Sequence, residues 1–312
     1  MKGRWIGTFL AAGIALAQEP ATFRAGVSLV RVDAEVTSAE GRLLTGFTKD
    51  DFRVLDEGKE RPVLHFSSGE EPLDLILLFD VSYSMKSVVE AVSAAAREGF
   101  RELRAGDRVA VMTFNTSSSL VAPFTEDLGA VERTIREDVV GGRFGGGTHI
   151  QAAVDDAARL FLAEKRSERR RAVLIVTDNI GTRTRREATV VRDFWEADAI
   201  LSGLVVHNPK WEAMQKASIV LNPSNLALQA GMKGIAQKTG GDFIHSGDPG
   251  MAFPDAMHRI RTRYSLYYGL PPEGKANSTR TVHVELSAKA ARQHPKARVR
   301  ARTGYLVPER VE

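Results

Sequence analysis

The sequence predicts an α/β fold in which a doubly wound, mostly parallel sheet is inserted into a β-sandwich formed by the N- and C-terminal strands. The middle of the chain alternates short apolar runs with helix-compatible segments, which is typical of a parallel sheet with helices on both faces. Both ends instead alternate apolar and polar residues, the period of half-buried strands. Because domain termini usually lie close together, an insertion of this kind is workable.

Four segments are expected from this pattern. They are a signal peptide over 1–17, an N-terminal β segment over 18–72, an α/β domain over 73–262 and a C-terminal β segment over 263–312. Two separate small β units are the alternative to one sandwich built from both ends. The shared sandwich is favoured because a few short strands cannot cover both of their faces alone.

The first residues resemble an export signal. Lys2 and Arg4 give a positive start, and the apolar run Trp5–Leu16 is too short to span a bilayer comfortably. Small residues before position 18 fit a signal-peptidase cleavage site. An uncleaved anchor or a buried first helix is the alternative. We expect a mature protein without a transmembrane span, located in the periplasm or outside the cell.

Composition excludes several classes of site. The 312 residues include no cysteine, which excludes disulfides, thiolate metal sites and cysteine nucleophiles. With 43% hydrophobic and 26% charged residues, the balance is that of an ordinary globular protein. The net charge of +4 is small for this length, so the arginine-rich stretch 165–171 is expected to be a solvated turn and not a nucleic-acid site.

Before residue 73 the chain is expected to form short strands. Alternating apolar residues over 27–36 predict the first strand, and Ala39–Gly41 predicts a turn after it. Thr48–Phe52 has the pattern of a short capped turn. Asp56–Lys59 is a second, hairpin-like turn, with Val63–Phe66 extended after it.

The middle segment supplies the parallel sheet. Buried strands are expected at Leu75–Phe79, Val109–Phe114, Ala172–Val176, Leu201–Val206 and, more briefly, Asp242–Ile244. Helices are expected at Met85–Leu103, Leu128–Val139, Ile150–Leu162, Glu187–Ala197, Leu226–Gln237 and Phe253–Ile260. Val121–Phe124 is predicted to be an edge strand because Pro123 cannot donate to a ladder.

The last segment returns to β structure. Tyr264–Leu270, Thr281–Leu286 and Ala297–Val307 are the expected strands, with a loop over Pro271–Ser278 between the first two. Since the middle segment separates these strands from those before residue 73, the two sets are the halves of the predicted sandwich.

Oxygen-bearing side chains follow the first buried strand. Asp80, Ser82 and Ser84 lie between that strand and the next helix, and ligands of open α/β sheets bind at this edge. A carboxylate and two hydroxyls suit Mg²⁺, Mn²⁺ or Ca²⁺, but three oxygens do not fill a shell of about six. The alternative is structural: Asp80 caps the helix and the serines satisfy backbone N–H groups.

Two later residues can complete such a site. Thr148 follows three glycines and precedes a predicted helix, and glycines let backbone approach a bound ion closely. Asp178 follows an apolar strand, so it belongs to the same sheet edge. Three loops with oxygen ligands are thus expected to converge.

This combination resembles the von Willebrand factor A (VWFA) domain with its metal-ion-dependent adhesion site (MIDAS). Gly106–Val109 leading to Thr113–Asn115, and Pro123–Thr125, support the resemblance, which covers roughly 73–262. The flanks are similar to a bacterial group of exported "VWFA-related" proteins. The similar stretches are Leu29–Val36, Phe47–Val54, Asp56–Lys59, Tyr264–Tyr268 and Arg302–Tyr305.

The resemblance implies a role for each residue. Ser82, Ser84 and Thr148 would bind Mg²⁺ (or Mn²⁺ or Ca²⁺) by their hydroxyls, and Asp80 and Asp178 would act directly or through water. The remaining position would accept an acidic side chain of a partner protein. The chain departs from the family's pattern at 179, where Asn replaces a glycine that is often found there; Asn tolerates unusual backbone angles.

Neighbouring residues are candidates for contacting a partner. They are Tyr83, His149, Arg183 and Arg185. Arginines just after Asp178 could steer an acidic partner, although a solvated helix start is their default interpretation. The histidines at 149, 207 and 245 are expected to be structural or exposed, since zinc needs several nitrogen or sulfur ligands together.

An enzymatic function has less support in the sequence than a binding function. No Gly-x-Ser-x-Gly, His-Glu-x-x-His or complete P-loop occurs. The best case is a metal-dependent phosphohydrolase using Asp80, but such enzymes commonly place a second carboxylate where Ser82 stands. Three hypotheses for the function therefore remain. They are an exported, metal-dependent adhesion or scaffold module, a metal-dependent hydrolase, and a structural domain whose ion only stabilises loops.

Overall fold

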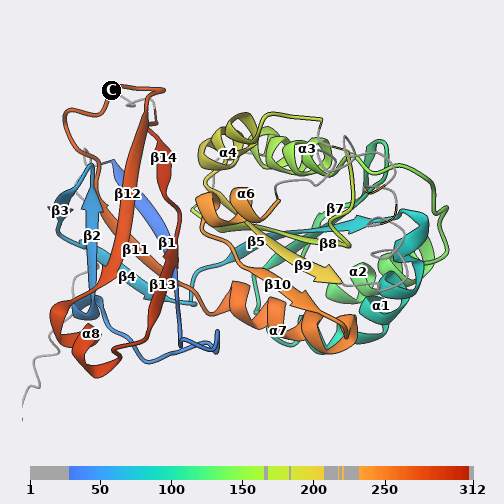
Figure 1. The fold of residues 1–312 in the computed structure, drawn as a ribbon, viewed down its shortest axis with the longest axis horizontal. Helices are drawn as coiled ribbons and strands as arrows, with labels where there is room; N and C mark the ends of the chain where they lie inside the picture. Colours follow the sequence, from blue (N-terminus) through green and yellow to red (C-terminus); the bar gives the residue numbers. More distant parts are fainter. Residues whose placement is uncertain are drawn as a thin grey trace, which may run out of the picture.

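The computed structural model describes residues 28–164, 168–182, 184–206, 217, 220 and 232–308. Its elements form two lobes that lie side by side (Figure 1). The α/β lobe runs from strand β5 to helix α7, and the sandwich lobe contains β1–β4 and β11–β14. The α/β fold with a parallel sheet inserted into a sandwich is therefore confirmed.

The α/β lobe is built on one six-stranded sheet. The spatial order is β10-β9-β8-β5-β6-β7, and all neighbours are parallel except β6 and β7. The strands are β5 (Leu73–Asp80), β6 (Arg108–Phe114), β7 (Ser118–Thr125), β8 (Arg170–Thr177), β9 (Ala199–Val206) and β10 (Phe243–Ser246). Strand β7, which contains Pro123, lies at the edge as expected.

Helices cover both faces of this sheet. On one face are α1 (Lys86–Phe100), α2 (Leu128–Thr134) and α7 (Pro249–Arg261); on the other are α3 (Ile150–Ala163), α4 (Glu187–Glu196) and α6 (Met232–Thr239) (Figure 1). Each face has its own apolar core, because β5 and β8 are buried along their whole length. The helix predicted to reach Val139 changes to a π-helical turn at Ile135–Val139. The start predicted for α6 at Leu226 lies outside the described residues.

The sandwich lobe combines strands from both ends of the chain. One sheet has the order β13-β1-β11-β4 and the other β14-β12-β2-β3. The first contains β1 (Leu29–Thr37), β4 (His65–Ser68), β11 (Tyr264–Gly269) and β13 (Arg298–Ala301). The second contains β2 (Phe52–Asp56), β3 (Lys59–Arg61), β12 (Thr279–Leu286) and β14 (Gly304–Leu306). The shared sandwich is confirmed, and the alternative of two separate β units is wrong.

Two details of this lobe differ from the sequence-based expectation. The strand predicted over Ala297–Val307 is broken at Arg302–Thr303, so that β13 and β14 belong to different sheets. A short helix, α8 (Ala288–Gln293), follows β12, and the Ser287 side chain caps it. The remaining turns agree: Thr48 and Asp51 form a capping box at a 3₁₀ turn (Lys49–Asp51).

Buried arginines join the lobes. Arg170, at the start of β8, donates to the carbonyl oxygens of Ile260 and Arg261 at the end of α7, and its Nε lies 3.6 Å from Asp33 in β1. Arg263 lies between α7 and β11 and donates to the Gly240 carbonyl at 2.6 Å. A charge this deeply buried needs partners, and here they come from both lobes.

Among the described residues, the structure contains no helix that is long and apolar enough to cross a membrane. The proposed signal peptide at 1–17 lies outside the described residues.

Candidate metal centre

Asp80 ends β5, and Thr177 ends the neighbouring strand β8. Because the strands are parallel with Phe79 beside Val176, the next two side chains are adjacent. Thr177 Oγ1 donates to Asp80 Oδ2 at 2.7 Å, and the Ser82 N–H donates to Oδ1 at 2.9 Å. Asp80 is completely buried. Its carboxylate is thus held in one orientation at the sheet edge.

The two serine hydroxyls connect this edge to Asp178. Ser82 Oγ and Ser84 Oγ are 3.2 Å apart, and Ser84 Oγ donates to Asp178 Oδ2 at 2.6 Å. The other oxygen of Asp178 accepts from the Ile180 N–H at 3.0 Å. Asp80, Ser82 and Ser84 therefore meet Asp178 at one place, although 94 residues of sequence separate Ser84 from Asp178.

These contacts bear on the alternative that Asp80 caps the following helix and that the serines satisfy backbone N–H groups. Helix α1 begins after Met85 without a side-chain cap, so Asp80 does not cap it. From this segment Asp80 accepts hydrogen bonds from Ser82, and the serine hydroxyls contact each other and Asp178. The serines are therefore not used as backbone caps.

Thr148 is brought to the same edge by its own loop. Gly145 pairs with the Ser82 segment: the Tyr83 N–H donates to its carbonyl at 3.1 Å. The Thr148 carbonyl accepts from the Thr182 N–H at 2.9 Å. Gly181 permits this approach, since a Cβ there would lie 2.6 Å from the Thr148 carbonyl oxygen. The loop carrying Thr148 thus contacts both of the other loops.

The site concentrates negative charge in a buried place. Burial raises the pKa of Asp80 to about 7, and the nearby charge of Asp178 adds to this effect. Burial also raises the pKa of Asp178, against the hydrogen bonds from Ser84 and the Ile180 N–H. Two carboxylates held together out of water are stabilised by a cation.

The donor set fits a hard divalent ion. The candidate donors are the carboxylates of Asp80 and Asp178 and the hydroxyls of Ser82 and Ser84, with the hydroxyl of Thr148 on the adjoining loop. All are oxygen, which suits Mg²⁺, Mn²⁺ or Ca²⁺ and not zinc or copper. Within the described part of the chain, no group of three or more His, Cys, Asp or Glu side chains could hold a metal ion. A cation here would therefore use hydroxyl and water oxygens beside the two carboxylates.

Two further residues support the site, although the sequence pattern assigned neither of them a role in it. The Thr177 hydroxyl holds Asp80 and also accepts the Asn179 N–H at 3.0 Å. Asn115, which follows β6, accepts the His149 N–H at 2.7 Å through its carbonyl oxygen and so positions the start of α3. A hydroxyl directly before a strand-end aspartate is the signal that could have identified Thr177. Asn179 has φ +59°, which lies in the left-handed region. Glycine adopts this conformation readily, and Asn tolerates it better than most other residues.

Residues 75–181 match the family described as von Willebrand factor type A domain. The α/β lobe thus contains a von Willebrand factor type A domain. The matched stretch begins within β5 and ends three residues after Asp178, so all five candidate donors lie inside it. No curated protein sequence matches the chain.

Solved structures with a similar arrangement come from several bacteria. A von Willebrand factor type A protein from Catenulispora acidiphila aligns with 92% of this chain and 76% of its own, at 12% identity and a TM-score of 0.47. The conserved hypothetical protein BatB from Bacteroides thetaiotaomicron aligns with 60% of this chain and 97% of its own, at 17% identity and a TM-score of 0.45. The corresponding domain of the type V pili tip protein Mfa5 from Porphyromonas gingivalis aligns with 36% and 39%, at 19% identity and a TM-score of 0.30.

The candidate partner-contacting residues of the von Willebrand factor type A domain differ in their surroundings. Tyr83 is 67% exposed beside the two serines. His149 is half-buried at the start of α3 and does not cap it. The Arg185 guanidinium lies 3.5 Å from Asp155 on α3, so it makes an ion pair within the domain. Arg183, like His207, lies outside the described residues.

Proposed function

We propose that this protein is an exported, metal-dependent protein-binding module of the adhesion or scaffold type. Its von Willebrand factor type A domain would hold Mg²⁺, with Mn²⁺ or Ca²⁺ as possible substitutes, at a MIDAS formed by Asp80, Ser82, Ser84, Thr148 and Asp178. The observation that supports this most strongly is the contact of Ser84 Oγ with Asp178 Oδ2 at 2.6 Å, because it joins two loops that carry hard ligands.

The arrangement suits an ion that bridges two proteins. A bound divalent ion supplies an electrophilic centre that attracts a carboxylate. Thr177 and the Ser82 N–H orient Asp80, and the Ile180 N–H orients Asp178, so few ligands need to rearrange on binding. Five side chains leave part of a six-fold shell for a partner's Asp or Glu. Exposed Tyr83 beside the serines offers an aromatic surface for the same partner.

Catalysis has less support at this site. A phosphohydrolase built on Asp80 would need a second carboxylate or a base close to the scissile bond. The position two residues after Asp80 is Ser82, and the nearest carboxylate, Asp178, is bonded to Ser84 and to the Ile180 N–H. We therefore propose binding and not turnover as the activity.

Export is proposed from the sequence of residues 1–17. With the signal peptide removed, the mature chain would act in the periplasm or outside the cell. The absence of cysteine fits either location, since the fold then needs no disulfide chemistry there.

The test is partner capture under control of the ion. Immobilised mature chain is incubated with envelope extract in Mg²⁺, and bound proteins are eluted with EDTA. We expect a protein that is released by EDTA and is not captured by Asp80→Ala or Ser84→Ala. Ser93→Ala, a serine on α1 away from the centre, is the matched control and should capture normally.

Each alternative has its own result. An unchanged complex after chelation, with a lower melting temperature, would mean that the ion only braces loops. Hydrolysis of p-nitrophenyl phosphate that Asp80→Ala abolishes would support the phosphohydrolase instead. Direct titration of Mg²⁺ into wild-type protein and Ser84→Ala separates loss of the ion from loss of the partner.

A further inference from the structure

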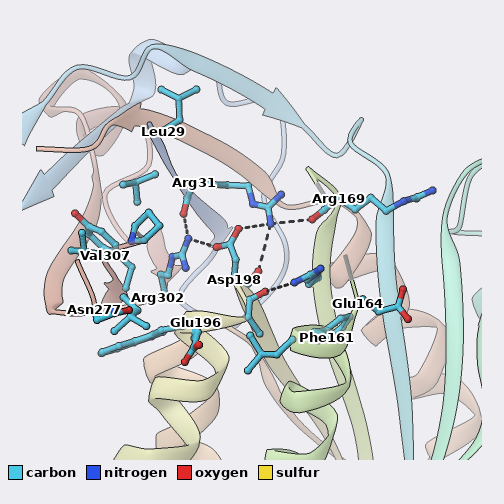
Figure 2. Close-up of a pocket in the computed structure, with 18 residues that line it drawn as sticks. Leu29, Arg31, Phe161, Glu164, Arg169, Glu196, Asp198, Asn277, Arg302 and Val307 are labelled. Carbon is cyan, nitrogen blue, oxygen red and sulfur yellow. Dashed lines mark hydrogen bonds and ion pairs between the residues drawn. The ribbon is translucent and has the colours of Figure 1, made fainter. Parts of the chain in front are cut away.

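A second cavity lies between the two lobes, far from the metal centre. Its volume is about 690 Å³, within the range of about 300–1,000 Å³ found for small-molecule sites. The sandwich contributes Leu29–Arg31, Asn277, Arg302 and Tyr305–Pro308 to its lining. The α/β lobe contributes the ends of α3 and α4 and the start of β8 (Figure 2). Since β8 enters the cavity at Arg171 and ends beside Asp178, the cavity and the metal centre lie at opposite edges of the sheet.

Two buried arginines meet over one aspartate in this cavity. Arg31 donates to Asp198 Oδ2 at 2.7 Å, and Arg302 donates to Asp198 Oδ1 at 2.6 Å (Figure 2). Arg302 also donates to the Arg31 carbonyl, and Arg31 donates to the Glu168 carbonyl at 3.0 Å. Both arginines are 7% exposed. These contacts fix the guanidinium groups in place.

Each of these arginines keeps one donor unused. Among the described residues, neither Arg31 Nε nor Arg302 Nε has a hydrogen-bond partner, although both atoms are buried. A buried donor without a partner costs about 1–3 kcal/mol. Because neither atom has accessible surface, the two guanidinium groups contribute positive charge to the cavity wall and not a free Nε donor.

The cavity also has an excess of positive charge on its inner wall. Arg171 lines it, donates to the Ala197 carbonyl at 3.1 Å and lies over the Phe161 ring. Burial lowers the pKa of Arg171 more than the surrounding carboxylates raise it. Within the lining, the guanidinium groups of Arg31, Arg171 and Arg302 face the carboxylate of Asp198. Glu71 lies 4.0 Å from Arg31 but does not line the cavity. The other two acids in the lining, Glu164 and Glu196, are solvent-accessible.

The rest of the lining is apolar. Leu162, Trp195, Leu306 and Val307 come from both lobes and surround the charged wall. Few convergent polar groups within apolar walls are the usual features of a site for a small organic ligand. Because the polar groups of the inner wall are mainly guanidinium groups, the ligand is expected to be an anion.

We propose that this cavity binds a small organic monoanion with an apolar body, such as a medium-chain carboxylate. Its carboxylate would be attracted by the guanidinium charge of the inner wall, and its apolar body would pack against Trp195 and Leu162. The ligand would contact both lobes at once. This site is independent of the proposed metal centre.

The test uses the mature chain and defined probes. Binding of the fluorescent anion 1-anilinonaphthalene-8-sulfonate is measured, followed by its displacement with decanoate, decanol and decylamine. We expect decanoate to displace the probe at concentrations about tenfold lower than either of the others, because only decanoate offers both a negative charge and an apolar chain. EDTA should not change this result, so its failure is distinguishable from failure of the metal centre.

A matched pair of variants localises the binding. Leu162 is 39% exposed and lines the cavity, whereas the next residue, Ala163, is exposed and does not. Leu162→Glu is expected to weaken decanoate binding at least about tenfold by repulsion and lost apolar contact, and Ala163→Glu to leave it within about twofold. Absence of probe binding, equal displacement by decylamine, or equal effects of the two variants would each overturn the proposal.

Discussion

Replacing Asp80 by Asn should stabilise the protein when no divalent ion is present. Asp80 is completely buried beside Asp178, so its ionised form is costly without a cation. Asn has the same shape and carries no charge, and its carbonyl oxygen can still accept the Ser82 N–H. We expect the variant to lose ion binding and to gain stability in EDTA at the same time.

The magnitude follows from the two pKa values of Asp80. Burial, and secondarily the charge of Asp178, raises its pKa to about 7 in the folded protein, against about 3.9 in an unfolded chain. The folded state therefore holds a proton that the unfolded state has lost, and the stability from this group is full below about pH 4 and is lost as the pH rises through 7. Between pH 6 and 8 the loss is about 1.4 kcal/mol, and roughly 3–5 °C in melting temperature.

The assay is thermal unfolding of wild type and Asp80→Asn in EDTA at several pH values from 6 to 8. The melting temperature of the wild type should fall more steeply over this range than that of the variant. Asp50→Asn, which removes an exposed carboxylate outside the site, is the control and should follow the wild type. Saturating Mg²⁺ should then raise the melting temperature of the wild type and of the control, but not of Asp80→Asn.

One result would refute the reasoning. If wild type and Asp80→Asn lose stability in parallel between pH 6 and 8 in EDTA, the two aspartates do not share a buried, charge-destabilised site. A gain of stability by Asp80→Asn in Mg²⁺ equal to that of the wild type would contradict the metal centre itself.

Three further predictions concern the supports of the site and of the lobe junction. Gly181→Ala places a Cβ 2.6 Å from the Thr148 carbonyl oxygen and should weaken Mg²⁺ binding about tenfold by titration calorimetry without removing a ligand, whereas Gly247→Ala, with nothing within 4 Å, should not. Thr177→Val removes a buried hydroxyl with two partners and should cost about 1–3 kcal/mol in urea unfolding; no change would contradict its role. Burial acts to raise the pKa of Asp33, but the guanidinium groups of Arg170 and Arg31 outweigh burial and lower this pKa to about 2. As the pH falls from about 4 to 2, the free energy of unfolding should therefore decrease more for the wild type than for Asp33→Asn.

The order of strands and helices could be predicted because the two periodicities differ. Fully apolar runs in the middle and alternating runs at the ends separated the parallel sheet from the sandwich. The break at Arg302 could not be predicted, because alternation of basic and small residues continues across it. Only the contacts of its guanidinium with Arg31 and Asp198 explain why the strand leaves one sheet there.

The candidate donors could be predicted because strand ends of a parallel sheet meet at one edge. Asp80 and Asp178 follow from that rule, and the contact through Ser84 agrees with it. The inter-lobe cavity could not be predicted. It depends on arginines spread from β1 to the end of the chain, and nothing in their local sequence distinguishes them from solvated side chains.

The sandwich has a consequence for the order in which the chain can acquire its structure. In one sheet β1 lies between β13 and β11, and in the other β2 lies between β12 and β3. Strands β1 and β2 therefore pair with strands that are synthesised much later, after the whole α/β lobe. Bringing these strands together closes a long loop, which has an entropic cost. The contiguous α/β lobe can form first and bring both ends together, so a shortened chain that stops after α7 would leave β1 and β2 with unpaired edges prone to association.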